Sequence, residues 1–293
     1  MGQQPLNIPE RELMRGGHLA CPGCGQALGL RLVLKALGKR TIAVIPPGCS
    51  TTTSGIWPQS ALRIPVMHTT YDGAAPTAAG IRAALDRRED KRVTVMVWAG
   101  DGATFDAGMS AVSASAERND DILYICCDNE AYMNTGNFLS SATPYGATLA
   151  GIRDGLKRPD HKKSILDILA SQKIPYFASC TIAHANDLLR KLRSAKQRKG
   201  FRFIHLLTPC PPGWQIQTEM TVEICRLAVN SGVFPLVEMQ SGGTLEILDM
   251  SDQRIPVAEY VRHQGRFRNL SEREIALFQK QVDENLEDLT TRS

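Results

Sequence analysis

Two loops in the middle of the sequence carry the residue types that a magnesium–diphosphate site requires. Gly100-Asp101-Gly102 follows an apolar run, and Asn129 follows the next apolar run along the chain. A carboxylate and a carboxamide oxygen are suitable ligands for Mg²⁺, and small residues let backbone N–H groups approach a diphosphate closely. Gly-Asp-Gly alone occurs in many turns. Its combination with a following helix, a strand and an Asn-containing loop favours a site of this kind.

Four cysteines in three loops form a second candidate site. Cys21 and Cys24 are separated by Pro-Gly, whereas Cys49 and Cys210 each lie in a loop with flanking Pro and Gly. The pair at 21 and 24 alone could be half of a zinc site, a redox pair or two free thiols. Four thiolates together can enclose either an iron–sulfur cluster or a zinc ion.

The other four cysteines are predicted to be core residues. Cys126 and Cys127 lie inside an apolar run, Cys180 follows another, and Cys225 lies in a predicted helix. A free cysteine in such surroundings commonly packs as a small apolar side chain.

The loops that carry Cys49, Asp101, Asn129 and Cys210 follow short apolar runs, which are predicted to be strands. Cys21 and Cys24 lie in a loop that opens a predicted helix. Runs of this kind, with little alternation of polar residues, are typical of strands covered on both faces; they span residues 42–45, 92–98, 122–127 and 201–207. Segments with helical periodicity alternate with them, at residues 25–37, 77–85, 107–118, 164–171 and 186–197. This alternation predicts an α/β fold, a parallel sheet with helices on both faces. Ligands bind at the carboxyl ends of the strands in such sheets, which is where these loops would lie.

The character of the sequence changes near residue 230. We expect a domain over residues 1–230, which carries both candidate sites, and a C-terminal arm over residues 231–293 that contacts partner subunits. The arm includes a predicted charged amphipathic helix at residues 269–289. The alternative is that this helix only covers its own domain.

The composition is that of an ordinary globular protein, with 293 residues, 43% of them hydrophobic and 22% charged. The formal net charge is only +4 and the basic residues are scattered, so we expect no nucleic-acid partner. The absence of 18 consecutive apolar residues argues against a membrane span, and the N-terminus lacks the apolar core of a signal peptide. We therefore expect a cytoplasmic protein whose thiols stay reduced.

Beyond these patterns, six runs of the sequence resemble one family. They are HLACPGCGQALGLR, PPGCS, GDGATFDAGMSAVSASAERNDDILYICCDNEAYMNTG, SSATPYGA, TPCPPGW and EYVRHQGRFRNL. These runs resemble the β subunit of pyruvate:ferredoxin oxidoreductase and its relatives, the 2-oxoacid:acceptor oxidoreductases. The resemblance covers nearly the whole chain, its central run is highly specific, and it implies the thiamine-diphosphate-binding fold.

The resemblance also implies roles for individual residues. Asp101 and Asn129 match the side-chain ligands of Mg²⁺, and the carbonyl group of Ala131 matches a third ligand. The positions that hold the diphosphate of thiamine diphosphate are matched by Gly102, Ala103 and Thr135. Asn134 matches a catalytic position near the thiazolium ring and the substrate. The ligands of a 4Fe–4S cluster are matched by Cys21, Cys24, Cys49 and Cys210.

The implied activity is the oxidative decarboxylation of a 2-oxo acid to acyl-CoA and CO₂, with electrons leaving through the 4Fe–4S cluster. The implied partners are α and γ/δ subunits of the same oxidoreductase, ferredoxin or another electron acceptor, and coenzyme A. No Glu here matches the family's carboxylate partner of the aminopyrimidine ring, and no ferredoxin-type run of cysteines is present. We therefore expect this chain to act only within a complex.

The sequence departs from the pyruvate-type pattern directly after Gly136. That pattern continues with an aliphatic residue, Gln and Arg, whereas this chain has Asn137, Phe138 and Leu139. Such residues near the substrate would suit a bulkier or aromatic 2-oxo acid, such as phenylglyoxylate or a branched-chain acid, in place of pyruvate. The alternative is that they only pack against a partner subunit.

Two other readings of the chain compete with this one. A thiamine-diphosphate decarboxylase or synthase subunit without a cluster would explain Asp101 and Asn129 but not the four loop cysteines. A zinc-binding scaffold subunit would explain the cysteines but not the magnesium-type pair. His18 and His68, which are close to the candidate sites, are expected to have structural hydrogen bonds. The alternative is that they handle protons.

Overall fold

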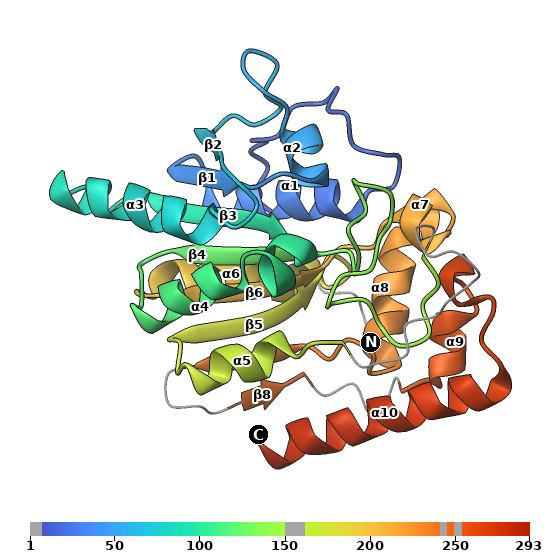
Figure 1. Ribbon diagram of the computed structural model, residues 1–293. Helices are drawn as coiled ribbons and strands as arrows, with labels where there is room; N and C mark the ends of the chain where they lie inside the picture. Colours follow the sequence, from blue (N-terminus) through green and yellow to red (C-terminus); the bar gives the residue numbers. More distant parts are fainter. Residues whose placement is uncertain (1–7, 150–161, 241–244, 249–253) are drawn as a thin grey trace.

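The computed structural model describes residues 8–149, 162–240, 245–248 and 254–293. The centre of the fold, among these residues, is one eight-stranded sheet with the order β2-β1-β3-β4-β6-β5-β7-β8. Figure 1 shows the twisted sheet with helices packed on either side. The strands are β1 (Thr41–Ile45), β2 (Val66–His68), β3 (Thr94–Gly100), β4 (Leu123–Asp128), β5 (Tyr176–Thr181), β6 (Arg202–Leu207), β7 (Val237–Gln240) and β8 (Leu245–Ile247).

The predicted parallel sheet is confirmed for β1 to β6, whose neighbouring strands all pair in parallel. The last two strands differ, because β7 pairs antiparallel with β5 and β8 pairs antiparallel with β7. The four predicted strands correspond to β1, β3, β4 and β6. No bounds were predicted for β2, β5, β7 or β8. Cys180 lies inside β5, whereas it was predicted to follow a strand.

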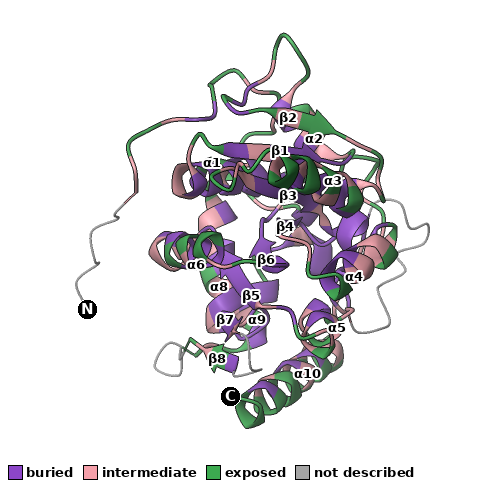
Figure 2. Cartoon of the chain, turned by 90° about the vertical axis from the view of Figure 1, so that its left-hand side faces the viewer, coloured by how far each residue is buried: buried purple, intermediate pink, exposed green. Residues whose placement is uncertain are grey.

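Helices cover both faces of the sheet, as predicted. In Figure 2, α1, α6 and α8 lie on one side of the strands, whereas α3, α4 and α5 lie on the other. Neighbouring residues of β3 point to opposite faces: Met96 and Trp98 join the core under α1, while Val95 and Val97 join the core under α3 and α4. The helices are α1 (Gly25–Leu37), α2 (Cys49–Ser54), α3 (Ala74–Arg87), α4 (Met109–Glu117), α5 (Ile165–Ser171), α6 (Ala185–Gln197), α7 (Pro211–Trp214), α8 (Thr221–Asn230), α9 (Val257–Val261) and α10 (Glu272–Thr291).

The strand order explains how distant loops come together. Strands β1, β3, β4 and β6 are consecutive neighbours in the sheet and run in the same direction. The loops after their carboxyl ends therefore lie side by side at one edge. In sequence order, these loops carry Cys49, Asp101, Asn129 and Cys210.

The chain beyond residue 230 packs on the part that precedes it. Strands β7 and β8 extend the same sheet, and the side chains of Tyr260 and Arg266 are fully buried. Helix α10 begins with a capping box, in which Ser271 and Glu274 each bond to the other's backbone. The contact of this segment with partner subunits stays a prediction. No helix in the described part of the chain is long and apolar enough to cross a membrane.

Candidate functional site

Asp101 and Asn129 meet at the carboxyl ends of β3 and β4. Both side chains are buried. One terminal atom of the Asn129 carboxamide lies 3.1 Å from Asp101 Oδ1 and 2.7 Å from the carbonyl oxygen of Ala131, while the other lies 3.0 Å from Gln26 Nε2. With the amide oxygen toward Asp101, three oxygen atoms face one another, an arrangement that a cation between them would stabilise. With the amide turned over, its nitrogen donates to the other two oxygens.

The turn through Glu130 brings the three oxygen groups together. Glu130 has a φ of +63°, in the left-handed region that residues other than glycine rarely adopt. Its backbone N–H donates to Asp128 Oδ1 (2.7 Å), and its carbonyl oxygen accepts a hydrogen bond from Thr143 Oγ1 (2.7 Å). These bonds hold a conformation that is otherwise unfavourable. Conformations of this kind are concentrated at functional sites.

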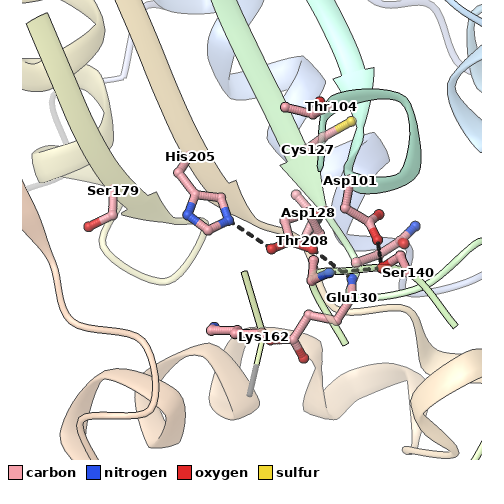
Figure 3. A network of polar contacts seen from close by, with 12 residues as sticks. Asp101, Thr104, Cys127, Asp128, Glu130, Ser140, Lys162, Ser179, His205 and Thr208 are labelled. Atoms are coloured by element: carbon pink, nitrogen blue, oxygen red, sulfur yellow. Dashed lines mark hydrogen bonds and ion pairs between the residues drawn. The ribbon is translucent and has the colours of Figure 1, made fainter. Parts of the chain in front are cut away.

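The surroundings of Asp101 disfavour an ionised carboxylate in the absence of a counter-charge. Burial and the nearby carboxylate of Asp128 raise the pKa of Asp101 well above its usual range, whereas the hydrogen bond that Ser140 Oγ donates to Asp101 Oδ2 acts in the opposite direction. Figure 3 shows Asp101, Asp128 and Glu130 close together below the ends of their strands. A divalent cation at Asp101 would therefore compensate a concentration of negative charge.

Gly102 and Ala103 begin a short π-helical turn, η1 (Gly102–Asp106), directly after Asp101. Both residues are buried. A Cβ atom at position 102 would lie 2.4 Å from the ring of Tyr132, so only glycine fits there. The same tyrosine donates a hydrogen bond to the Gly102 carbonyl oxygen (3.4 Å). Backbone groups of this turn could hold a diphosphate beside the three oxygens.

Asn134 and Thr135 lie at the exposed tip of the loop that follows Ala131. This loop is closed by backbone bonds between Tyr132 and Phe138, and Thr135 Oγ1 donates to the Tyr132 carbonyl oxygen (3.3 Å). Asn134 lines the pocket next to Asn129. Thr135 is thus the one predicted diphosphate residue that is exposed in the single chain.

The four loop cysteines line one pocket of about 80 Å³, which they share with Asn129 and Asn134. Cys21 and Cys24 form a tight turn before α1, and the backbone N–H of Gly25 donates to the Pro209 carbonyl oxygen (3.1 Å). That bond ties the first pair of cysteines to the loop of Cys210. The neighbouring thiols add to the effect of burial and raise the pKa of Cys49 to about 12 and that of Cys210 to about 11.

Over the described ranges, no three His, Cys, Asp or Glu side chains are close enough to hold one metal ion. The four thiols surround a common pocket but do not converge on a point. By contrast, a four-iron cluster binds each thiolate to a different iron atom, so its ligands need not converge in this way. The remaining cysteines Cys126, Cys127, Cys180 and Cys225 are fully buried, as predicted.

Comparisons with known proteins identify relatives of this chain. Residues 47–206 match the family "Thiamine pyrophosphate enzyme, C-terminal TPP binding domain". The ketoisovalerate oxidoreductase subunit VorB of Pyrococcus abyssi is 44% identical over 97% of this chain and 94% of its own length. For the pyruvate synthase subunit PorB of Methanothermobacter thermautotrophicus, the identity is 41% over 97% of this chain and 99% of its own length. The chain belongs to the thiamine-diphosphate-binding β subunits of the 2-oxoacid:ferredoxin oxidoreductases.

A solved structure has the same fold as this β subunit. The 2-oxoglutarate:ferredoxin oxidoreductase from Magnetococcus marinus aligns with a TM-score of 0.60 and 22% identity, over 71% of this chain and 70% of that chain. At this identity the likeness concerns the fold alone. The predicted family and the predicted thiamine-diphosphate-binding fold are thus confirmed.

Several residues that shape the site of the β subunit were not predicted. Glu130 forms an ion pair with the fully buried Arg266 (2.7 Å), and Ser140 donates to Asp101. Ser140 and Arg266 lie in two of the runs that resemble the family, but neither run indicates which residue they contact. The two histidines near the site have local backbone bonds: His18 Nδ1 accepts from Ala20 N (3.4 Å), and His68 Nε2 lies 3.2 Å from the Gly55 carbonyl oxygen.

Proposed function

We propose that this β subunit holds Mg²⁺ and thiamine diphosphate at Asp101, Asn129 and Ala131, and a 4Fe–4S cluster at Cys21, Cys24, Cys49 and Cys210. The complex to which it belongs would convert a 2-oxo acid and coenzyme A to acyl-CoA and CO₂, and would transfer the electrons to ferredoxin. The observation that carries this proposal is the cluster of three oxygens around Asn129, next to a pocket lined by four thiols.

The residues around Asn129 fit a magnesium diphosphate. Mg²⁺ would accept one oxygen each from the Asp101 carboxylate, the Asn129 carboxamide and the Ala131 carbonyl group, and the diphosphate would complete its coordination. Gly102 and Ala103 would hold the diphosphate through their backbone, and Thr135 and Asn134 would close over it from the exposed loop. When bound, thiamine diphosphate supplies the electron sink that decarboxylation of a 2-oxo acid requires. This chain would supply the ligands that position the cofactor and the negative charge that Mg²⁺ compensates.

The four cysteines fit a cluster better than a single zinc ion. Zinc in a structural site is held by four ligands at one point, and no such convergence occurs among the described side chains. A zinc-binding scaffold also gives no role to Asp101 and Asn129. A cluster-free thiamine enzyme leaves four thiols around one pocket without a role. A bound cluster supplies a one-electron acceptor beside the cofactor.

A branched-chain 2-oxo acid is the substrate that we propose first, with pyruvate as the second candidate. The curated relatives include a subunit named for ketoisovalerate and one named for pyruvate synthase, at 44% and 41% identity. Phe138 is 46% exposed in the single chain and lies at the base of the loop that carries Asn134. An exposed aromatic side chain at this position supports a pocket for a bulky acyl group.

The surface near the cysteines suits a partner subunit. Leu19, Ile56 and Trp57 are 76%, 64% and 87% exposed, and each lies within a few residues of Cys21 or of α2, the helix that begins at Cys49. Aromatic and aliphatic side chains exposed together are typical of protein interfaces. We propose that α and γ/δ subunits cover this surface and that the complex works in the cytoplasm.

Anaerobic purification of the co-expressed complex tests the proposal. We expect the complex to contain stoichiometric thiamine diphosphate and Mg²⁺. Part of its iron and sulfide should be bound to the β subunit and should be missing from a preparation without that subunit. A 2-oxo acid should reduce ferredoxin only when coenzyme A is present. Thiamine diphosphate without iron on this subunit would support the cluster-free alternative. Zinc in place of iron, without thiamine diphosphate, would support the scaffold alternative.

A further inference from the structure

Arg266 is a fully buried cation that belongs to neither cofactor site. Its Nη2 lies 2.7 Å from Glu130 Oε2 and donates to the Tyr260 hydroxyl group (3.0 Å), and its Nε donates to Gln264 Oε1 (2.9 Å). A buried charge is strongly unfavourable unless it is paired and hydrogen-bonded. The pair with Glu130 therefore fixes both side chains in one arrangement.

Trp214 lies against Arg266 and contacts both candidate sites. The guanidinium carbon of Arg266 is 3.5 Å from the centre of the indole ring, within the range of a cation–π contact. The indole Nε1–H donates to the carbonyl oxygen of Asn129 (2.8 Å), and the backbone N–H of Trp214 donates to the carbonyl oxygen of Cys210 (2.8 Å). One buried residue thus connects the loop of the magnesium ligands, through its side chain, to the loop of a cluster ligand, through its backbone.

Glu130 connects Arg266 to the turn that carries the proposed magnesium ligands Asn129 and Ala131. It lies between Asn129 and Ala131 and has the left-handed backbone conformation that brings those two oxygens together. Its carboxylate is held by Arg266 at 2.7 Å, with Lys162 farther away at 3.7 Å. Without Arg266, this carboxylate would lose its nearest counter-charge, and the turn would lose one of its anchors.

We propose that Arg266, Glu130 and Trp214 form a positioning unit that couples the two cofactor sites. The unit fixes the magnesium-ligand turn 129–131 relative to Cys210, and its two opposite charges set the electrostatic potential at the cluster. This inference rests on the proposed function, because it requires that both groups bind where we assign them. None of the three residues is among the ligands that we assign to either cofactor.

The charge of Arg266 acts at the cluster loop. Its guanidinium group lies 3.5 Å from the ring centre of Trp214, and the backbone N–H of Trp214 donates to the Cys210 carbonyl oxygen, so the charge is close to that loop. A nearby positive charge favours the reduced, more negative state of a cluster, and a nearby negative charge disfavours it. Removal of the two charges of the pair should therefore shift the midpoint potential of the cluster in opposite directions.

Four variants of the assembled complex test the proposal, with a redox titration of the cluster monitored by electron paramagnetic resonance. We expect a shift to lower potential in Arg266→Met and to higher potential in Glu130→Gln. In Arg266→Lys, which keeps the charge, the potential should return toward the wild-type value. Trp214→Phe keeps both charges, so its potential should stay close to wild type. The matched control is Arg262→Met, because Arg262 is exposed and its side chain contacts its neighbours Glu259 and His263, away from both candidate sites.

A second readout is the Mg²⁺-dependent affinity for thiamine diphosphate, measured by calorimetry. Residues that orient metal ligands typically change metal affinity by about 10- to 100-fold when they are replaced. We expect a loss of that size in Arg266→Met and in Trp214→Phe, which removes the bond to Asn129 but keeps an aromatic ring under Arg266. If Arg266→Met fails to assemble, Glu130→Gln still tests the midpoint potential and Trp214→Phe still tests the affinity for thiamine diphosphate.

Two different failures can be distinguished. If the wild-type complex contains no thiamine diphosphate or no iron on this subunit, the proposed function is wrong. If the wild-type complex contains both, but the variants match Arg262→Met, the coupling alone is wrong. Shifts of the midpoint potential in the same direction for Arg266→Met and Glu130→Gln would also overturn it, because general loosening of the site, and not charge, would then explain them.

Discussion

Asp101 Oδ1 lies 3.1 Å from a terminal atom of the Asn129 carboxamide, although the two residues follow different strands. The contact exists because β3 and β4 pair in parallel, with Gly100 opposite Cys127. Both strands therefore end at the same edge of the sheet. The left-handed turn at Glu130 then brings the Ala131 carbonyl group to the same point. Three oxygens on two loops thus form one candidate magnesium site.

Replacement of Asp101 should abolish retention of the cofactor. We expect Asp101→Asn to weaken Mg²⁺-dependent binding of thiamine diphosphate by more than about 100-fold, because a direct ligand matters more than the residues that orient it. Calorimetry on the assembled complex measures this. Asp106→Asn is the control, because Asp106 lies on the same turn but accepts hydrogen bonds from Ser141. Equal affinity in the Asp101 variant and the wild type would remove Asp101 from the ligand set.

Replacement of a loop cysteine should remove the cluster but not the fold. In Cys49→Ala and Cys210→Ala we expect less iron and sulfide and slow reduction of ferredoxin, with almost unchanged thermal stability of the apo chain. Cys180→Ala provides the contrast: this buried core residue should cost about 1–3 kcal/mol of stability and leave the iron content intact. Full iron occupancy in both loop variants would contradict the assignment of the four thiols.

Phe138 should influence which 2-oxo acid is used. If its ring contacts a bulky acyl group, Phe138→Ala should lower kcat/KM for a branched-chain 2-oxo acid relative to pyruvate by about 10-fold. A panel of 2-oxo acids, assayed with the same enzyme preparation, measures the ratio. A uniform loss for all substrates, together with weaker subunit assembly, would show that Phe138 packs against a partner subunit instead.

Trp57 should contribute to subunit assembly. Its side chain is 87% exposed in the single chain, and an interfacial tryptophan can contribute about 2 kcal/mol or more to binding. We expect Trp57→Ala to weaken assembly, measured by mass photometry at decreasing concentration, without lowering the melting temperature of the isolated chain. Arg88→Ala, at the exposed end of α3, is the control. Unchanged assembly would place the partner on another surface.

The magnesium pair, Cys49 and Cys210 could be predicted because each lies in a loop after a recognisable apolar strand. Cys21 and Cys24 instead precede α1, and their two-residue spacing indicated them. Strand ends of a parallel sheet meet at one edge, so Asp101, Asn129, Cys49 and Cys210 were expected to be neighbours, and they are. The core cysteines Cys126 and Cys127 could be predicted from the apolar run that contains them.

The contacts that hold the site could not be predicted in the same way. Glu130 and Arg266 are charged residues far apart in sequence, and nothing local indicates that both are fully buried and paired. The left-handed conformation of Glu130 depends on bonds to Asp128 and Thr143, so it is set by the tertiary structure. Strands β7 and β8 are short and antiparallel, and their sequences lack the long apolar runs of β3 and β4.

Anomalous diffraction from crystals of the complex, with thiamine diphosphate and Mn²⁺ in place of Mg²⁺, tests the magnesium site. We predict a manganese peak at about 2.0–2.2 Å from an Asp101 carboxylate oxygen, from the Asn129 carboxamide oxygen and from the Ala131 carbonyl oxygen, separate from the peaks of the iron atoms. A manganese peak elsewhere, or an Asn129 amide whose nitrogen donates to Asp101 while the cofactor is bound, would contradict the account.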